Sequence, residues 1–166
     1  MFKKIIIVMA VALALPVVAA AQKFGVVDVN TVFTAMPETT AAQNQLQEAS
    51  KKYDEEYKKL QEEVDKKYQE YQGLAADTPE SIKERRMQEI QELAQKIDAF
   101  RNTAAGDLER QQQQLMAPIQ QKLVDAIKAV GQEGGYTFIF ENAVPVYQGS
   151  EVTDVTSAVK GKLGIK

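Results

Sequence analysis

Residues 46–71 of this chain, LQEASKKYDEEYKKLQEEVDKKYQEY, predict a long α-helix with a single apolar stripe. Its apolar positions follow one another at intervals of 3, 4, 4, 3, 4, 4 and 3 residues. The mean interval is about 3.6, which is the period of an α-helix. The stripe consists of Leu46, Ala49, Tyr53, Tyr57, Leu60, Val64, Tyr68 and Tyr71. All other positions are polar, so this helix cannot form a globule by itself.

A second helix with a stripe of its own follows. Pro37 marks the start of the first helix and Gly73 its end, and Thr78 is expected to cap the second helix with Pro79 at its first position. Gly131 and the pair Gly134-Gly135 end the second helix. Its apolar positions are Ile90, Leu93, Ile97, Phe100, Ala104, Leu108, Leu115, Ile119, Leu123, Ile127 and Val130. The two stripes predict an antiparallel hairpin, an arm over residues 38–117.

The two ends of the chain are rich in β-branched and aromatic residues. Residues 23–30, KFGVVDVN, predict one strand, and residues 136–147, YTFIFENAVPVY, predict two strands joined by a tight turn at Glu141-Asn142. Pro145 places the last strand at a sheet edge, and Ser150 is expected to cap a short closing helix over 151–163. Residues 22–37 and 118–166 therefore predict a small β-strand body. The fold class is α+β, mostly helical, with the arm projecting from that body.

The first 21 residues have the layout of a secretory signal peptide. Lys3 and Lys4 precede an apolar run over residues 5–15, and the small residues 19–21 form an Ala-x-Ala cleavage site. We expect cleavage after Ala21 and an exported mature chain that begins at Gln22. The alternative is an uncleaved membrane anchor, because residues 5–21 are apolar throughout.

Composition excludes several classes of function. The chain has no cysteine and no histidine, which removes disulfides, thiol chemistry, His/Cys metal sites and His-based catalytic triads. Its net charge of −3 gives no general reason to bind nucleic acid. Asp28, Glu141 and Asp154 lie nearest the predicted strands, and a paired-carboxylate hydrolase is the enzymatic alternative; acids at such places usually cap helices or turns. We expect no enzymatic activity and no cofactor.

The order of elements resembles the Skp (OmpH-like) family of periplasmic chaperones. The resemblance covers nearly the whole mature chain. It is sharpest in residues 23–33, KFGVVDVNTVF, and in the tail, residues 126–156, AIKAVGQEGGYTFIFENAVPVYQGSEVTDVT. It implies a periplasmic homotrimer in which the strands form a shared barrel and the arms surround a cavity. It also implies that unfolded outer-membrane β-barrel proteins are held there without nucleotide. The residues expected to assemble the trimer are Phe24, Val26, Val27, Phe138, Ile139, Phe140, Val144 and Val146.

The charge of the arm departs from the basic members of that family, for which lipopolysaccharide is a partner. Residues 41–117 carry 12 basic and 16 acidic side chains. The only concentrated basic patch is Lys83, Arg85 and Arg86. It is a candidate for contact with clients, a membrane surface or lipopolysaccharide, and the alternative is a solvated helix start.

Four tyrosines on one helix face, Tyr53, Tyr57, Tyr68 and Tyr71, are also candidates for contact with unfolded chains. The alternative places them in the seam between the two helices. Gly106 and Pro118 are hinge candidates within the second helix, or Pro118 marks a kink where arm meets body. An adaptor coiled coil that binds one folded envelope partner is the competing function, because the same arm would serve either role.

Overall fold

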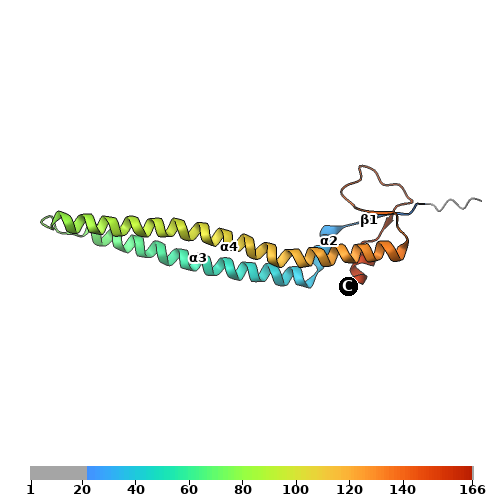
Figure 1. Ribbon diagram of the computed structural model, residues 1–166, viewed down its shortest axis with the longest axis horizontal. Helices are drawn as coiled ribbons and strands as arrows, with labels where there is room; N and C mark the ends of the chain where they lie inside the picture. Colours follow the sequence, from blue (N-terminus) through green and yellow to red (C-terminus); the bar gives the residue numbers. More distant parts are fainter. Residues whose placement is uncertain (1–21, 166) are drawn as a thin grey trace, which may run out of the picture.

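The computed structural model describes residues 22–165, and an antiparallel helical hairpin dominates it (Figure 1). Helix α3 runs from Pro37 to Gln72 and helix α4 from Glu80 to Gly134, with 36 and 55 residues. At about 1.5 Å per residue, they are about 54 and 82 Å long. The predicted signal peptide lies outside the described residues. None of the helices described in residues 22–165 has an apolar stretch sufficient to cross a bilayer.

The ends of both helices follow from local chemistry. Met36 is extended, and Pro37 lies in the first turn of α3. Backbone N–H groups in a first turn have no acceptor within the helix, so proline, which has no N–H, costs nothing there. The prediction that Thr78 caps the second helix is wrong by one residue. Pro79 takes the cap position because its ψ of 138° is extended, and its carbonyl accepts the N–H of Ile82. Gly135 ends α4 in the left-handed conformation, with φ of 65°.

The sheet has three parallel strands in the order β2-β1-β3. Strand β1 (Phe24–Val27) lies between β2 (Phe138–Glu141) and β3 (Thr153–Asp154). The predicted hairpin is therefore wrong, although a tight turn does follow β2, where the N–H of Val144 donates to the carbonyl of Glu141 at 3.0 Å. A parallel neighbour requires a long crossover, which the helices provide between β1 and β2 and residues 142–152 provide between β2 and β3. Val144 and Val146, expected in a strand, lie in that second crossover.

Two short helices also depart from the sequence-based expectation. Residues 23–30 are not one strand, because Asp28 ends β1 and caps helix α2 (Val29–Ala35) by accepting the N–H of Thr31 at 2.7 Å. Helix α5 (Thr156–Lys162) is shorter than the predicted 151–163. Residues 153–154 complete the sheet instead, and Asp154 accepts the N–H of Thr156 at 2.8 Å. Ser150 does not cap this helix.

The core lies between one face of the sheet and the body end of α4. Because side chains alternate along a strand, Val27 of β1 and Ile139 of β2, the register partner of Gly25, point toward the helices. Gly25 shares that face, and a Cβ there would approach the ring of Tyr136 at 3.2 Å, so only glycine lets the ring lie against β1. The buried cluster comprises Val27, Val32, Met36, Ala42, Ile119, Leu123, Ala126, Val130, Val155 and Val159.

The arm has a much thinner seam than the body. In its outer part only Leu60, Ile90 and Ala104 are buried among the described residues. Pro118 does not interrupt α4, which continues through it to Gly134. Helix α4 changes direction gently near the start of α3 (Figure 1). The predicted hinges at Gly106 and Pro118 therefore lie within one continuous helix, and their mobility stays a prediction.

Candidate functional surfaces

The outward face of the sheet is apolar and aromatic. Strand register places Phe24 beside Phe138 and Val26 beside Phe140, so these four side chains share the face opposite the core. The rings of Phe24 and Phe138 stack with centroids 6.3 Å apart, and those of Phe138 and Phe140 are 5.8 Å apart. Phe138 is nevertheless 56% exposed. The sheet is thus covered by helices on one face only.

The crossover 142–152 extends this apolar surface. It arches away from the sheet on the side opposite α4 (Figure 1). Val146 is fully exposed, Tyr147 is 85% exposed and Val144 is 64% exposed. A hollow of about 290 Å³ lies between the crossover and the sheet. It is lined by Phe24, Val26, Phe140, Val144, Pro145, Tyr147, Gln148 and Val152. We call the outward sheet face and this crossover the open apolar surface.

The structure brings six of the eight predicted assembly residues together on the open apolar surface. They are Phe24, Val26, Phe138, Phe140, Val144 and Val146. Val26 lines the hollow under the crossover and is already buried in the single subunit, at 5% exposure. The other two point inward: Val27 is 2% exposed, and Ile139 packs against the core of the same subunit. Tyr147 belongs to the surface but was absent from the sequence-based set. Its place next to Val146 and Pro145 in an apolar run was the available signal.

Two of the four candidate tyrosines are held by side chains of the arm. The Tyr53 hydroxyl donates to Asp107 at 3.1 Å, and its ring packs on Phe100 at 6.0 Å. That hydrogen bond to a carboxylate raises the pKa of Tyr53. The Tyr57 ring lies under the guanidinium of Arg101 at 5.9 Å. These contacts place Tyr53 in the seam.

The other two tyrosines are more accessible. Tyr68 is 47% exposed, and Tyr71 is half-buried near the arm tip, where it lines a groove. Neither has the interhelical polar contact that holds Tyr53. Along the apolar stripe of α3, the tyrosines are therefore held in the seam at Tyr53 and become more accessible toward the arm tip, at Tyr68 and Tyr71.

Each side chain of the candidate basic patch has a carboxylate nearby. Lys83 lies 3.9 Å from Glu80, while Arg85 and Arg86 lie 3.8 and 3.0 Å from Glu89. Lys67 of α3 approaches Glu89 from across the hairpin at 3.5 Å. The hydrogen bond from Arg86, with the nearby positive charges, lowers the pKa of Glu89. The three bases of the patch and Lys67 thus share only two carboxylates, Glu80 and Glu89, which offset part of the positive charge.

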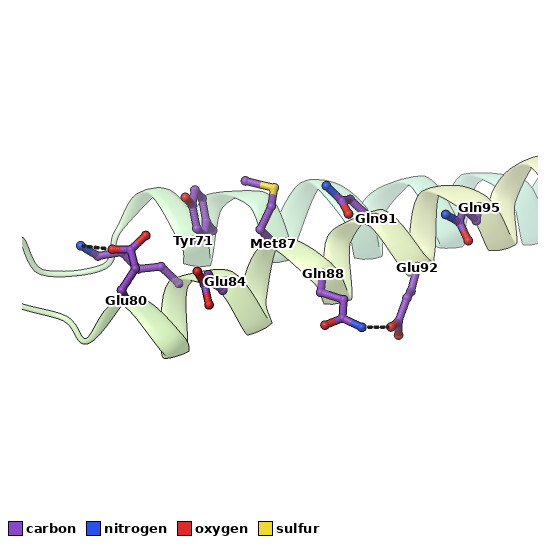
Figure 2. Close-up of a pocket in the computed structure, with 9 residues that line it drawn as sticks. Tyr71, Glu80, Glu84, Met87, Gln88, Gln91, Glu92 and Gln95 are labelled. Atoms are coloured by element: carbon purple, nitrogen blue, oxygen red, sulfur yellow. Dashed lines mark hydrogen bonds and ion pairs between the residues drawn. The ribbon is translucent and has the colours of Figure 1, made fainter.

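A groove of about 690 Å³ lies near the arm tip, on the outer face of α4 (Figure 2). It runs between two rows of side chains spaced four residues apart along the helix, with Tyr71 of α3 beside them. One row is Glu80, Glu84, Gln88 and Glu92, and the other is Lys83, Met87, Gln91 and Gln95. Gln88 donates to Glu92 at 3.0 Å. The sequence pattern did not single out this tip groove, because polar positions on a helix ordinarily indicate a solvated face.

The acids near the strands have structural roles. Asp28 accepts hydrogen bonds from the backbone and hydroxyl of Thr31, and Asp154 accepts from the backbone of Thr156. The Thr31 donors lower the pKa of Asp28, and the hydroxyl and backbone N–H of Thr156 lower the pKa of Asp154. Glu141 is exposed at the end of β2. Within residues 22–165, no group of three or more acidic side chains is arranged to hold a metal ion.

Comparison with known proteins agrees with this architecture. The family model for outer membrane protein (OmpH-like) matches residues 23–163. The chaperone protein Skp of Salmonella typhimurium is 26% identical over 141 residues, covering 84% of this chain and 85% of that protein. The Salmonella typhi protein of the same name matches equally. With a family match that spans the sheet, both arm helices and α5, the chain belongs to the OmpH-like family.

Proposed function

We propose that the protein is an ATP-independent holding chaperone of the periplasm that binds unfolded outer-membrane proteins and prevents their aggregation. It does so as a homotrimer whose arms enclose the client. The observation that carries the proposal is the open apolar surface at the base of an arm that has no globular partner of its own. The Salmonella relatives, which are named chaperones, and the secretory layout of the first 21 residues support it.

Assembly through the open apolar surface follows from the cost of leaving it in water. Burial of apolar area contributes about 25 cal/mol per Å², and exposed contiguous apolar patches usually mark interaction sites. Strands β2 and β3 also present free edges, which a neighbouring copy would pair. Three copies that share their sheets would cover the phenylalanine face and the crossover of each.

Holding by enclosure suits the arms. Each arm is long and mixed in charge, and its apolar seam is thin, so single contacts with a client are weak. Several arms on one base convert later contacts into intramolecular ones, which raises the overall affinity without any deep pocket. The contacts remain loose enough for release without nucleotide.

Sedimentation of the mature chain tests the assembly. Val146→Glu places a charge in the shared surface and should give monomers at micromolar concentration. Because Val146 is fully exposed in the subunit, this substitution leaves the subunit fold intact. Gln112→Glu adds the same charge at an exposed position of the arm and should remain trimeric. A monomeric unsubstituted chain would contradict the proposed trimer.

Light scattering tests the holding activity. An outer-membrane β-barrel protein is diluted from urea in the presence of a stoichiometric amount of trimer, and its aggregation should be suppressed. Val146→Glu should lose most of this effect, while Gln112→Glu keeps it. Unchanged aggregation with the unsubstituted trimer would favour an adaptor that binds a folded partner.

A further inference from the structure

We infer that the tip groove binds extended client segments in which a basic residue stands beside an apolar one. This inference rests on the proposed holding function and specifies which parts of a client the arm tip contacts. The volume of the tip groove, about 690 Å³, is within the range of about 300–1,000 Å³ typical of ligand-binding sites.

The groove offers apolar contact at one side. Met87 of α4 and Tyr71 of α3 rise on the same side of the groove, and both are only partly buried (Figure 2). Methionine is flexible and polarisable, and it adapts to differently shaped side chains. The tyrosine ring supplies amphipathic contact area with little loss of side-chain freedom. Together they suit a single aliphatic or aromatic residue of variable shape.

The opposite row supplies negative charge. It carries the carboxylates of Glu80, Glu84 and Glu92. Among the groove residues Lys83 is the only base, and it is paired with Glu80 at 3.9 Å. Glu84 and Glu92 make no ion pair within 4.0 Å in the described part of the chain. The groove therefore complements a cation and disfavours an anionic segment.

The other bases near the tip gather around Glu89 and do not line the groove. Arg85, Arg86 and Lys67 all lie within 4.0 Å of that one carboxylate. Glu89 does not line the tip groove. One carboxylate does not balance three bases, so the cluster around Glu89 keeps a positive charge, and Glu92 borders both that cluster and the groove. The groove lining itself carries three carboxylates and one lysine, which favours a cationic occupant there over an anionic headgroup.

Amide side chains make the groove suitable for a polypeptide. Gln91 and Gln95 each present a donor and an acceptor along the groove, and no hydrogen bond engages either side chain in the described residues. An unfolded segment has unpaired N–H and C=O groups that need such partners. The occupant we infer is accordingly an extended chain rather than a folded surface.

Two labelled peptides, identical except that one carries two lysines and the other two glutamates flanking a leucine-phenylalanine pair, test the inference by fluorescence anisotropy at low salt. The assembled full chain should bind the lysine peptide about fivefold to tenfold more tightly, since each exposed ion pair contributes modestly. Glu84→Gln with Glu92→Gln should abolish this preference. Glu62→Gln with Glu109→Gln, which removes equal charge elsewhere on the arm, should leave it unchanged.

Met87→Gln should weaken binding of both peptides alike. Equal binding of the two peptides by the unsubstituted protein would overturn the inference, as would a preference that survives loss of Glu84 and Glu92. Tighter binding of the glutamate peptide, or of anionic lipid vesicles, to the tip would overturn it too. Suppression of aggregation in the same preparation would show that the holding function stands even when the inference fails.

Discussion

Replacing Ile90 with alanine should loosen the outer arm and leave the body unaffected. Ile90 is 9% exposed, and it is one of only three buried side chains in the outer arm among the described residues. The body core contains ten buried residues. If stability follows burial, the arm tip opens without unfolding the body.

The expected magnitude follows from the geometry of the seam. Isoleucine-to-alanine changes in closed cores cost about 2–5 kcal/mol, of which part reflects the cavity left behind. A seam between only two helices has water on both sides and leaves no closed cavity, so the low end, about 2 kcal/mol, applies. Because about 1.4 kcal/mol is a factor of ten, local opening should become about 30-fold more frequent.

Amide hydrogen exchange measures this directly. Amides over residues 55–65 and 85–95 should exchange about 30-fold faster in Ile90→Ala, whereas those around Val130 and Val159 should not change. Gln91→Ala, at the exposed neighbouring position, should have little effect. Equal acceleration of exchange in the body and the arm would refute the independent opening of the arm. No acceleration in the arm would show that Ile90 does not stabilise the contact between the two helices.

Three further changes have defined outcomes. Thr39→Val should raise the free energy of unfolding by about 1 kcal/mol in denaturant titrations, because the Thr39 hydroxyl is buried without a hydrogen-bond partner. A loss of stability would mean that this hydroxyl forms a stabilising hydrogen bond. Gly106→Ala should slow amide exchange over residues 104–108 by up to about fivefold. The new methyl meets nothing within 4 Å, and alanine favours the helix by up to about 1 kcal/mol. If Gly106 or Pro118 is a hinge, amides over residues 104–120 of the unsubstituted chain exchange faster than those over 90–100. The Thr31 donors lower the pKa of Asp28 below its usual 3.8, so the stability that its carboxylate contributes is present above that pH and lost as pH falls through the folded-state value. Melting temperatures between pH 5 and 3 should therefore fall less for Asp28→Asn, which keeps a capping oxygen without titrating; parallel curves would contradict this.

Helical periodicity predicted the arm well, because a long helix depends on contacts between residues three or four apart, which the sequence shows directly. Pro37 and Gly73 mark its first helix correctly, and the pair Gly134-Gly135 marks the end of the second. Gly131, also expected at that end, lies within α4. The sheet was harder. Val144 and Val146 have strand-like residue types, but strand pairing depends on a partner far away in the sequence, and periodicity does not show that β1 takes its neighbours in parallel.

The missed helix α2 had a local signal that strand propensity concealed. Val26 and Val27 run directly into Val29, so the stretch is β-branched throughout, and Asp28 and Thr31 form a capping pair within it. The tip groove had no such signal. Its side chains are individually ordinary for a solvated helix face, and only the positions of Tyr71 across the hairpin and of Glu89 on another face distinguish it.

In the proposed trimer, the long helix α4 connects assembly to client binding. It contributes Ile119 and Leu123 to the body core, and it continues without a break to the groove at the tip. Pro118 removes one backbone hydrogen bond within it, at the level where α3 begins to pack. Fixing the body in an assembly therefore constrains the direction of the arm, and contacts as weak as those of a single tip become useful only when several arms are held on one base. In the proposed trimer, the open apolar surface thus controls affinity for clients from the far end of the molecule, without contacting them.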